Sequence, residues 1–138
     1  MIKTKLGIDK ILTISLKKRQ DRRDKFNDRF GVFDFSFVEA INGSKLDIPK
    51  LIKKKIVSKV QYDPMGSVNK NVIGCSLSHL KCWELFEKSE GETCLILEDD
   101  VVITKPLVDI RTNEQNEVVV ETSEFWNEIW EQIQSLDW

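Results

Sequence analysis

The chain has 138 residues, of which 41% are hydrophobic and 32% charged, and this balance excludes a disordered or fibrous protein and fits one folded domain. Its formal net charge of −2 argues against a dedicated nucleic-acid-binding protein, because such domains are usually basic as a whole. The charge is uneven: residues 1–81 contain 18 lysines and arginines and 8 acids, whereas residues 82–138 contain 3 and 15. This split fits either two halves that attract each other or a basic face for a polyanion.

Location and cysteine content are the next constraints. No apolar run approaches the roughly 20 residues of a membrane-spanning helix, and the N-terminus lacks the apolar core of a secretory signal. We therefore expect a cytoplasmic protein, with peripheral binding to a membrane surface as an open alternative. The three cysteines, an odd number without zinc-site spacing, suit a reducing compartment and favour buried or unreactive thiols. They are Cys75, Cys82 and Cys94.

The first three predicted elements form a β-α-β unit. Residues 10–16 (KILTISL) are apolar and β-branched, as in a buried strand, and residues 17–30 carry mixed charges, as in a helix after a short loop. Residues 34–43 place apolar side chains at alternate positions and end at an Asn-Gly turn, which predicts a second strand. Strand, helix and strand at this spacing predict a parallel sheet covered by helices.

The middle of the chain is less regular. Residues 45–60 carry a partial helical stripe with Pro49 near its start. Residues 61–71 are rich in turn-forming residues, which is equally consistent with a functional loop and a linker. Residues 72–91 predict a clear helix that Gly91 terminates. Its predicted apolar stripe consists of Leu77, Leu80, Trp83 and Phe86.

The last third begins with another apolar segment. Residues 93–103 (TCLILEDDVVI) predict a buried strand, and residues 105–123 look irregular apart from a short apolar run at 118–120. An amphipathic helix is predicted over about 123–137, with Ser123 as its N-cap. Its apolar stripe consists of Phe125, Trp126, Ile129, Trp130 and Ile133. We expect this tryptophan-rich helix to pack on the core or to contact a partner chain or a second copy.

Three adjacent acids, Glu98, Asp99 and Asp100, lie where the 93–103 strand leaves the core. Ligands of open α/β sheets bind beyond the carboxyl ends of the strands. Because successive strand residues face opposite sides, Glu98 and Asp100 should point together while Asp99 points away. Two carboxylates on one side suit Mg²⁺ or Mn²⁺, which would neutralise a diphosphate leaving group. Taken alone, the three acids are better explained as a solvated turn.

Two further motifs carry candidate ligands. Arg19, Arg22 and Arg23 follow the first strand, at the edge where a phosphate would bind, and arginine forks match phosphate oxygens. In isolation they are better explained as a helix face interleaved with aspartates. Small residues open the 72–91 helix, whose free N–H groups could face an anion. Its His79, the one histidine of the chain, is by itself more typical of a structural residue than of a ligand or base.

Four motifs follow one another along the chain: TISLKKRQDRR, VEAING, IGCSLSHLKCWE and CLILEDDV. In this order they resemble glycosyltransferase family 25, which includes bacterial lipooligosaccharide galactosyltransferases and collagen galactosyltransferases. The family pattern is an Asn-Leu strand end followed by arginines, a GC-x-SH helix, and LEDD at a strand end. Ser15-Leu16 stands where Asn-Leu is usual, and residues 41–43 stand where Asp-Ala-x-Gly is often found. The resemblance covers about residues 10–104.

The resemblance implies a GT-A fold: a single α/β nucleotide-sugar-binding domain over residues 1–138, with a mostly parallel, Rossmann-like sheet flanked by helices. It also implies a metal-dependent enzyme that transfers a hexose, most often galactose, from a UDP-sugar to a glycan, lipooligosaccharide or hydroxylated protein. Asp100 would bind Mn²⁺ or Mg²⁺ directly, and Glu98 would act on the ribose or through water, as the outer residues of a DxD-like motif. The implied donor site consists of Arg19, Arg22, Ser78, His79, Glu98 and Asp100.

The chain departs from the family after LEDD. Family members continue through further strands that form the acceptor site and supply the catalytic base, whereas this sequence stops at SLDW, as a truncated or compact version would. No catalytic base can be named. Three hypotheses remain: a galactosyltransferase, a non-catalytic nucleotide-sugar module that works with another chain, and an interaction domain without a ligand. A sheet lacking its second half would have an open edge strand and would dimerise or aggregate.

Overall fold

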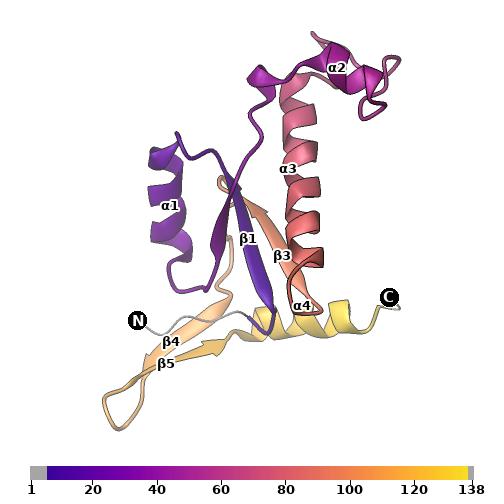
Figure 1. Ribbon diagram of the computed structural model, residues 1–138. Coiled ribbons are helices and arrows are strands. Elements are labelled where there is room, and N and C mark those ends of the chain that lie inside the picture. Colours follow the sequence, from indigo (N-terminus) through magenta and orange to yellow (C-terminus); the bar gives the residue numbers. More distant parts are fainter. Residues whose placement is uncertain (1–5, 137–138) are drawn as a thin grey trace.

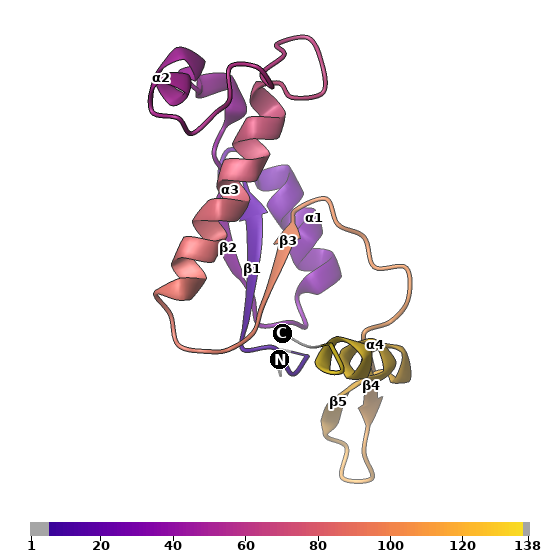
Figure 2. The same cartoon turned by 90° about the vertical axis from the view of Figure 1, so that its right-hand side faces the viewer.

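A small parallel sheet lies at the centre of the protein, with helices on both of its faces (Figure 1). The computed structural model describes residues 6–136. In spatial order the strands are β2 (Ser36–Glu39), β1 (Lys10–Ser15) and β3 (Cys94–Glu98). β1 pairs in parallel with both neighbours, so that Leu12 lies opposite Ser36 on one side and Ile96 on the other. Figure 2 shows α3 (Lys70–Glu87) in front of the sheet and α1 (Gln20–Phe30) behind it.

This arrangement confirms the predicted α/β class and its β-α-β unit. The helix expected over 17–30 begins at Gln20, because residues 16–19 form the turn that leaves β1. The strand expected over 34–43 is shorter, since only Ser36–Glu39 pairs with β1. The Asn-Gly pair instead opens a short 3₁₀ helix, η1 (Gly43–Lys45), where the Asn42 side chain accepts a hydrogen bond from the Ser44 amide.

The central strand divides the core into two clusters. On the α1 face, Phe26 and Phe30 stack with ring centroids 4.3 Å apart, and Ile11 of β1 joins the same cluster. On the α3 face, the buried residues are Leu12, Ile14, Val38 and Cys82. Because β1 is covered on both faces, its residues 11–15 are all buried, as expected of a central parallel strand.

The predicted helix over 72–91 exists as α3, but two of the four residues of its predicted apolar stripe are exposed to solvent. Leu80 and Trp83 of that stripe are exposed, Trp83 to 60%. The buried face instead consists of Ile73, Gly74, Ser78 and Cys82. These are mostly small residues that allow the helix to approach the backbone beside it: a Cβ atom on Gly74 would lie 2.8 Å from the Gly43 Cα. Hydrophobic periodicity misses such a face because close approach, rather than side-chain volume, creates it.

Residues 45–71 are mostly turns. The helical stripe expected over 45–60 is confirmed only for α2 (Ile48–Lys53), which the Asp47 side chain caps and which has Pro49 in its first turn. Lys55 then adopts a left-handed φ of 57°, which ends the helix. The turn-rich segment over 61–71 leads directly into α3, where the Asn69 side chain accepts from the amides of residues 71 and 72.

Two expectations for the last third are wrong. The strand predicted over 93–103 ends at Glu98, and the chain then turns away so that Val101 and Ile103 pack on the α1-side core. Most of residues 105–123 is not irregular but forms an antiparallel hairpin, β4 (Val108–Thr112) and β5 (Val118–Thr122). Its turn contains Asn116 with a φ of 65°, a conformation that asparagine tolerates better than most residues.

The predicted amphipathic helix is confirmed as α4 (Glu124–Gln134), with Ser123 accepting the N-cap hydrogen bond from the Trp126 amide at 3.1 Å. It ends earlier than expected, and residues 137 and 138 lie outside the described residues. Trp126 is 7% exposed and donates through its indole nitrogen to the Leu6 carbonyl at 2.9 Å. The helix therefore packs on the core, which is one of the two roles expected for it.

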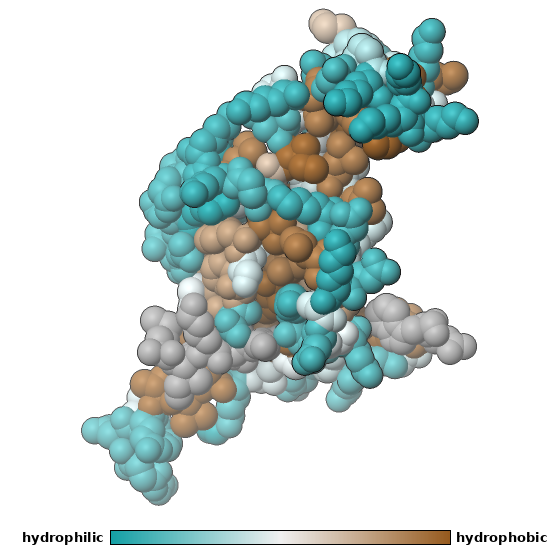
Figure 3. Space-filling model, in the orientation of Figure 1, coloured by the Kyte–Doolittle hydropathy of each residue, from teal (hydrophilic) through white to brown (hydrophobic). Residues whose placement is uncertain are grey.

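The outer surfaces complete the fold. Within residues 6–136, no strand pairs with the outer edge of β3, so the expected self-association through an open edge stays a prediction. Hydrophilic side chains predominate over the α2 region and cover the tip of the β4–β5 hairpin (Figure 3). None of the helices in the described part of the chain is both long enough and apolar enough to cross a bilayer.

Candidate functional site

A cavity of about 390 Å³ lies at the carboxyl edge of the sheet, where β1 and β3 end beside the first turns of α3. Five of the six residues predicted for the donor site line it: Arg19, Arg22, Ser78, Glu98 and Asp100. The sixth, His79, does not line the cavity but contacts Glu98. From β1 the chain goes first to β2 on one side and later to β3 on the other side, while all three strands stay parallel. Ligands of open α/β sheets bind at such a switch point, here between β1 and β3.

Two other cavities are mainly apolar. One of about 270 Å³ lies between the α1-side core and residues 101–107, and one of about 700 Å³ lies between α3, α4 and β3. Large apolar pockets are the usual default for a ligand site. Here the first is lined mostly by core side chains and the second by a mixture of core residues and more exposed ones such as Trp83, whereas charged groups from several elements converge on the 390 Å³ cavity. The polar chemistry of the described chain is therefore concentrated at the carboxyl edge of the sheet.

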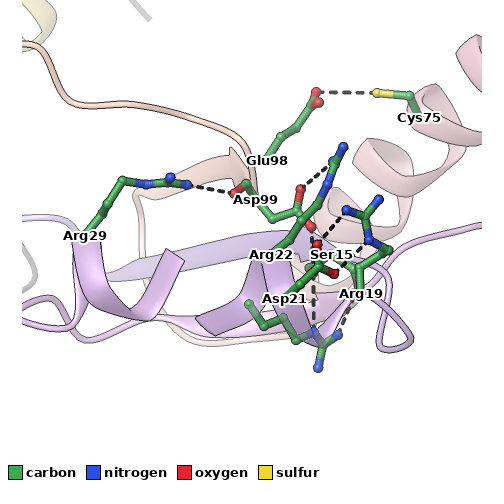
Figure 4. Close-up of polar contacts among 9 residues, drawn as sticks. Ser15, Arg19, Asp21, Arg22, Arg29, Cys75, Glu98 and Asp99 are labelled. Atoms are coloured by element: carbon green, nitrogen blue, oxygen red, sulfur yellow. Dashed lines mark hydrogen bonds and ion pairs between the residues drawn. The ribbon is translucent and has the colours of Figure 1, made fainter. Parts of the chain in front are cut away.

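The middle acid, Asp99, faces α1 and is 7% exposed (Figure 4). Its carboxylate accepts a hydrogen bond from the Ser15 hydroxyl at 2.8 Å and from the Arg22 guanidinium at 3.1 Å. Its backbone carbonyl accepts from Arg29 at 3.0 Å. An ionised carboxylate at this depth needs such partners, because burial without them is costly. Asp99 therefore joins β1, β3 and α1 at the base of the cavity.

The first acid, Glu98, points the other way, toward α3 (Figure 4). Its Oε1 atom lies 3.0 Å from His79 Nε2 and accepts a hydrogen bond from the Cys75 thiol at 3.4 Å. The hydrogen bond from His79 is the main reason that the pKa of Glu98 lies below its usual value. Partial burial, followed by the hydrogen bond to Glu98, raises the pKa of the Cys75 thiol. The opposite directions of Glu98 and Asp99 are those expected for neighbours at the end of a strand.

The third acid, Asp100, is exposed in the turn after β3. Strand alternation cannot place it beside Glu98, because β3 ends at Glu98; the turn brings both residues to the cavity wall instead. Among the described residues, no side chain forms a hydrogen bond or ion pair with the Asp100 carboxylate. Of the three acids, Asp100 is thus the one whose oxygens remain available to a ligand.

The three arginines after β1 have different environments. Arg19 forms a two-pronged ion pair with Asp21, at 2.7 and 2.8 Å, which lowers the pKa of Asp21 to about 2 and raises that of Arg19. Arg22 pairs with the buried Asp99. Arg23 donates to the Ser15 carbonyl at 3.0 Å and stacks over a phenylalanine ring, so its contacts are structural. Only Arg19 and Arg22 line the cavity.

Ser78 has both hydrogen-bonding roles of its hydroxyl filled. The hydroxyl donates to the Gly74 carbonyl at 2.7 Å and accepts from the Ile41 amide at 2.8 Å. It is 1% exposed and therefore ties α3 to the loop between β2 and η1. Together with the close approach of Gly74 to Gly43, this bond fixes one wall of the cavity.

The donor chemistry of the cavity suits the metal that the sequence predicts. Glu98 and Asp100 supply hard oxygen donors on the same wall, and Mn²⁺ or Mg²⁺ commonly takes one or two carboxylates together with substrate phosphates. Sequence reasoning missed one nearby donor, Cys75, which was expected to be an unreactive thiol. Among the described residues, Cys75, His79 and Glu98 are the group that brings three possible ligand atoms within 4.8 Å of one another. The four-residue spacing of Cys75 and His79 on a predicted helix was the signal that could have revealed it.

The fold and cavity define a class: an α/β protein with a polar ligand site at the switch point of a parallel sheet. The family model described as glycosyltransferase family 25 (LPS biosynthesis protein) matches residues 8–135. The chain belongs to this family, and the resemblance seen in its motifs is confirmed. Its three-stranded parallel sheet with flanking helices is consistent with a GT-A-like fold.

Several relatives carry transferase names. Procollagen galactosyltransferase 2 of Homo sapiens is 36% identical over 102 residues, which cover 70% of this chain and 16% of the relative. A glycosyltransferase 25 family member of Drosophila melanogaster is 32% identical over 105 residues, or 72% of this chain and 17% of the relative. Procollagen galactosyltransferase 1-B of Xenopus laevis is 30% identical over 102 residues, with 70% and 17% covered. The chain thus spans about a sixth of these relatives' length. No solved structure matches.

Proposed function

We propose that the cavity binds the nucleotide-sugar donor of a metal-dependent galactosyltransferase, with UDP-galactose as the donor. The observation that supports this most is the convergence of two arginines and two acids, Arg19, Arg22, Glu98 and Asp100, at the switch point between β1 and β3. A diphosphate and a divalent cation together complement that mixture of charges, whereas either one alone would leave like charges close to one another.

The side chains of the cavity would divide the work of holding the donor. Arg22 has a half-exposed guanidinium beside the cavity and is positioned by its bond to Asp99, so it can contact a phosphate without losing its buried partner. Arg19 would exchange its exposed partner Asp21 for a phosphate oxygen. Asp100 and Glu98 would hold Mn²⁺ or Mg²⁺, and the ion when bound would neutralise charge on the departing diphosphate.

The names of the relatives support galactose as the transferred sugar. The word procollagen in those names supports a protein as one acceptor, which we propose to be hydroxylated, whereas the description of the family as an LPS biosynthesis protein supports a lipooligosaccharide or another glycan. No catalytic base is assigned among the described residues. A cytoplasmic location is part of the proposal and is supported by three free cysteines, which suit a reducing compartment.

Thermal unfolding with UDP, UDP-galactose and UDP-glucose, each with and without Mn²⁺, tests donor binding. A ligand at 100 times its dissociation constant stabilises a protein by about 2.7 kcal/mol, a shift of several degrees in a domain of this size. We expect a shift that requires both nucleotide and metal and that disappears in Asp100→Ala. Asp109→Ala, which removes an exposed acid from β4, is the matched control and should keep the shift. The absence of a shift with every nucleotide would refute the proposal.

A non-catalytic nucleotide-sugar-binding module is the second candidate. The apolar cavity of about 700 Å³ favours it, because its lining includes the exposed Trp83 together with Trp130 and Ile133, apolar side chains suited to contact a partner chain or a second copy. This candidate predicts nucleotide binding without turnover on any acceptor, whereas the transferase predicts release of UDP when a suitable acceptor is added. An interaction domain without a ligand predicts no response to nucleotide at all.

A further inference from the structure

The geometry of Cys75, His79 and Glu98 points to a further metal site in this protein, which shares Glu98 with the site proposed above and is suited to Zn²⁺ or an ion of similar softness rather than to Mn²⁺. This inference does not depend on donor binding. It rests on the positions of three side chains from two elements, α3 and the end of β3, and on the chemistry of their sulfur, nitrogen and oxygen atoms.

The helix places two of the donors together. Residues four apart lie on the same side of an α-helix, one turn above the other, so Cys75 and His79 both face the end of β3. Glu98 meets them there: its Oε1 atom is 3.0 Å from His79 Nε2 and 3.4 Å from Cys75 Sγ. Two ligands at this spacing on one helix, completed by a carboxylate from elsewhere, are a common way to build a zinc site.

Two of the three separations between the ligand atoms are close to those that zinc requires, and the third, between Cys75 Sγ and His79 Nε2, is within 4.8 Å. Zinc lies about 2.3 Å from thiolate sulfur and about 2.0–2.2 Å from imidazole nitrogen or carboxylate oxygen. In a tetrahedral site these lengths separate nitrogen from oxygen by about 3.3 Å, and sulfur from oxygen by about 3.6 Å. The observed 3.0 and 3.4 Å are each within a few tenths of an ångström of those values. Small side-chain rotations would therefore open the cluster enough to admit an ion.

The ligand atoms distinguish this site from the Mn²⁺ or Mg²⁺ site proposed for nucleotide-sugar binding. Thiolate and imidazole favour Zn²⁺, whereas Mn²⁺ and Mg²⁺ prefer oxygen donors such as Asp100. On coordination the Cys75 thiol loses its proton to solvent, so that one thiolate and one carboxylate balance the two charges of the ion. Three protein ligands leave a fourth position, and because Cys75 and Glu98 line the 390 Å³ cavity, water or a ligand atom in that cavity can occupy it.

Titration of the reduced chain with Co²⁺ in the absence of nucleotide tests the inference. Co²⁺ substitutes for Zn²⁺, and a bound thiolate gives a sulfur-to-cobalt charge-transfer band that oxygen ligands cannot produce. We expect one such band, saturating at one ion per chain, displaced by Zn²⁺ and unaffected by excess Mn²⁺. Cys75→Ser should abolish the band. The matched control Cys94→Ser, which removes a thiol from β3 away from the cluster, should keep it.

Further variants separate this site from its neighbours. His79→Gln and Glu98→Gln should each weaken Co²⁺ binding by at least about 10–100-fold, since even indirect partners of metal ligands contribute that much. Asp100→Asn should leave the band intact while removing the nucleotide-dependent thermal shift, so the failure of either proposal is seen separately. Circular dichroism of each variant establishes that it is folded. A folded native chain that gives no thiolate band at saturating Co²⁺, or a band that survives in Cys75→Ser, would overturn the inference.

Discussion

Replacing Gly74 with alanine tests the close contact between α3 and the loop that forms one wall of the cavity. A Cβ atom at this position would lie 2.8 Å from two backbone atoms of Gly43 and 2.9 Å from the carbonyl oxygen of Ile41. Ordinary contacts of a Cβ atom begin near 3.4 Å, so each neighbour would have to retreat by about half an ångström. All three atoms belong to the backbone, and no side chain can rotate away to make room.

The sign of the effect is the informative part. On helix propensity alone, a change from glycine to alanine inside α3 would stabilise the protein by up to about 1 kcal/mol. Overpacking costs about 1–3 kcal/mol, and separating the two segments would weaken the 2.8 Å bond from the Ile41 amide to Ser78, worth about 1 kcal/mol. We therefore expect Gly74→Ala to lower the free energy of unfolding by about 1–3 kcal/mol.

Urea unfolding followed by circular dichroism measures this difference, and the melting temperature should fall by roughly 3–15 °C. Ser76→Ala is the matched control, since it lies on the exposed side of the same helix and should change stability by no more than about 0.5 kcal/mol. A Gly74→Ala protein as stable as the native chain, or more stable, would show that helix and loop are not in tight contact and that our account of α3 is wrong.

Three other predictions concern the acids and the core. Asp99→Asn should destabilise the protein by about 1–3 kcal/mol in urea unfolding, because the buried side chain that accepts hydrogen bonds from Arg22 and from the Ser15 hydroxyl loses its negative charge. The hydrogen bond from His79 lowers the pKa of Glu98 in the folded protein. The stabilisation from the Glu98 carboxylate is therefore complete at pH values above the pKa of about 4.5 in the unfolded chain, and it disappears as the pH falls through the lower pKa of the folded protein. The stability advantage of the native chain over Glu98→Gln should follow that course in unfolding measured from neutral to acidic pH, and a pH-independent difference would contradict it. Phe26→Ala, which removes a fully buried ring from between α1 and the sheet, should cost about 3–5 kcal/mol, visible as a large fall in melting temperature.

The elements that the sequence predicts well are those whose signal is local. β1 is a continuous apolar run, α1 follows it directly, and α4 has both a capping serine and a regular apolar stripe. The β4–β5 hairpin was missed because its turn relies on Asn116 in a left-handed conformation instead of the more recognisable Asn-Gly pair. The buried face of α3 was missed because glycine, serine and cysteine contribute little to a hydrophobic pattern. The hairpin depends on the backbone conformation of one turn residue, and the buried face of α3 depends on its contact with a loop that is distant in the sequence.

The candidate site shows the same limit in its chemistry. The position of LEDD at a strand end was readable, and the residues expected around a donor do converge on one cavity. The partners of each acid were not readable, because they come from α1 for Asp99 and from α3 for Glu98. Sequence reasoning also overlooked Cys75, since its role depends on a carboxylate 23 positions away.

Three adjacent carboxylates at a strand end should repel one another, yet the structure gives each a different environment. Asp99 is neutralised inside the protein by Arg22, Glu98 is turned toward His79 and the Cys75 thiol, and Asp100 remains in solvent. Because the three carboxylates point in different directions, their mutual repulsion is relieved without a bound ion. It also divides their roles, because a carboxylate bound to arginine is a poor metal ligand, whereas one beside imidazole and thiol, or one without a partner, is a good one. The same division explains why both proposed metal sites depend on Glu98. An ion bound by Cys75, His79 and Glu98 would prevent Glu98 from binding a second ion together with Asp100.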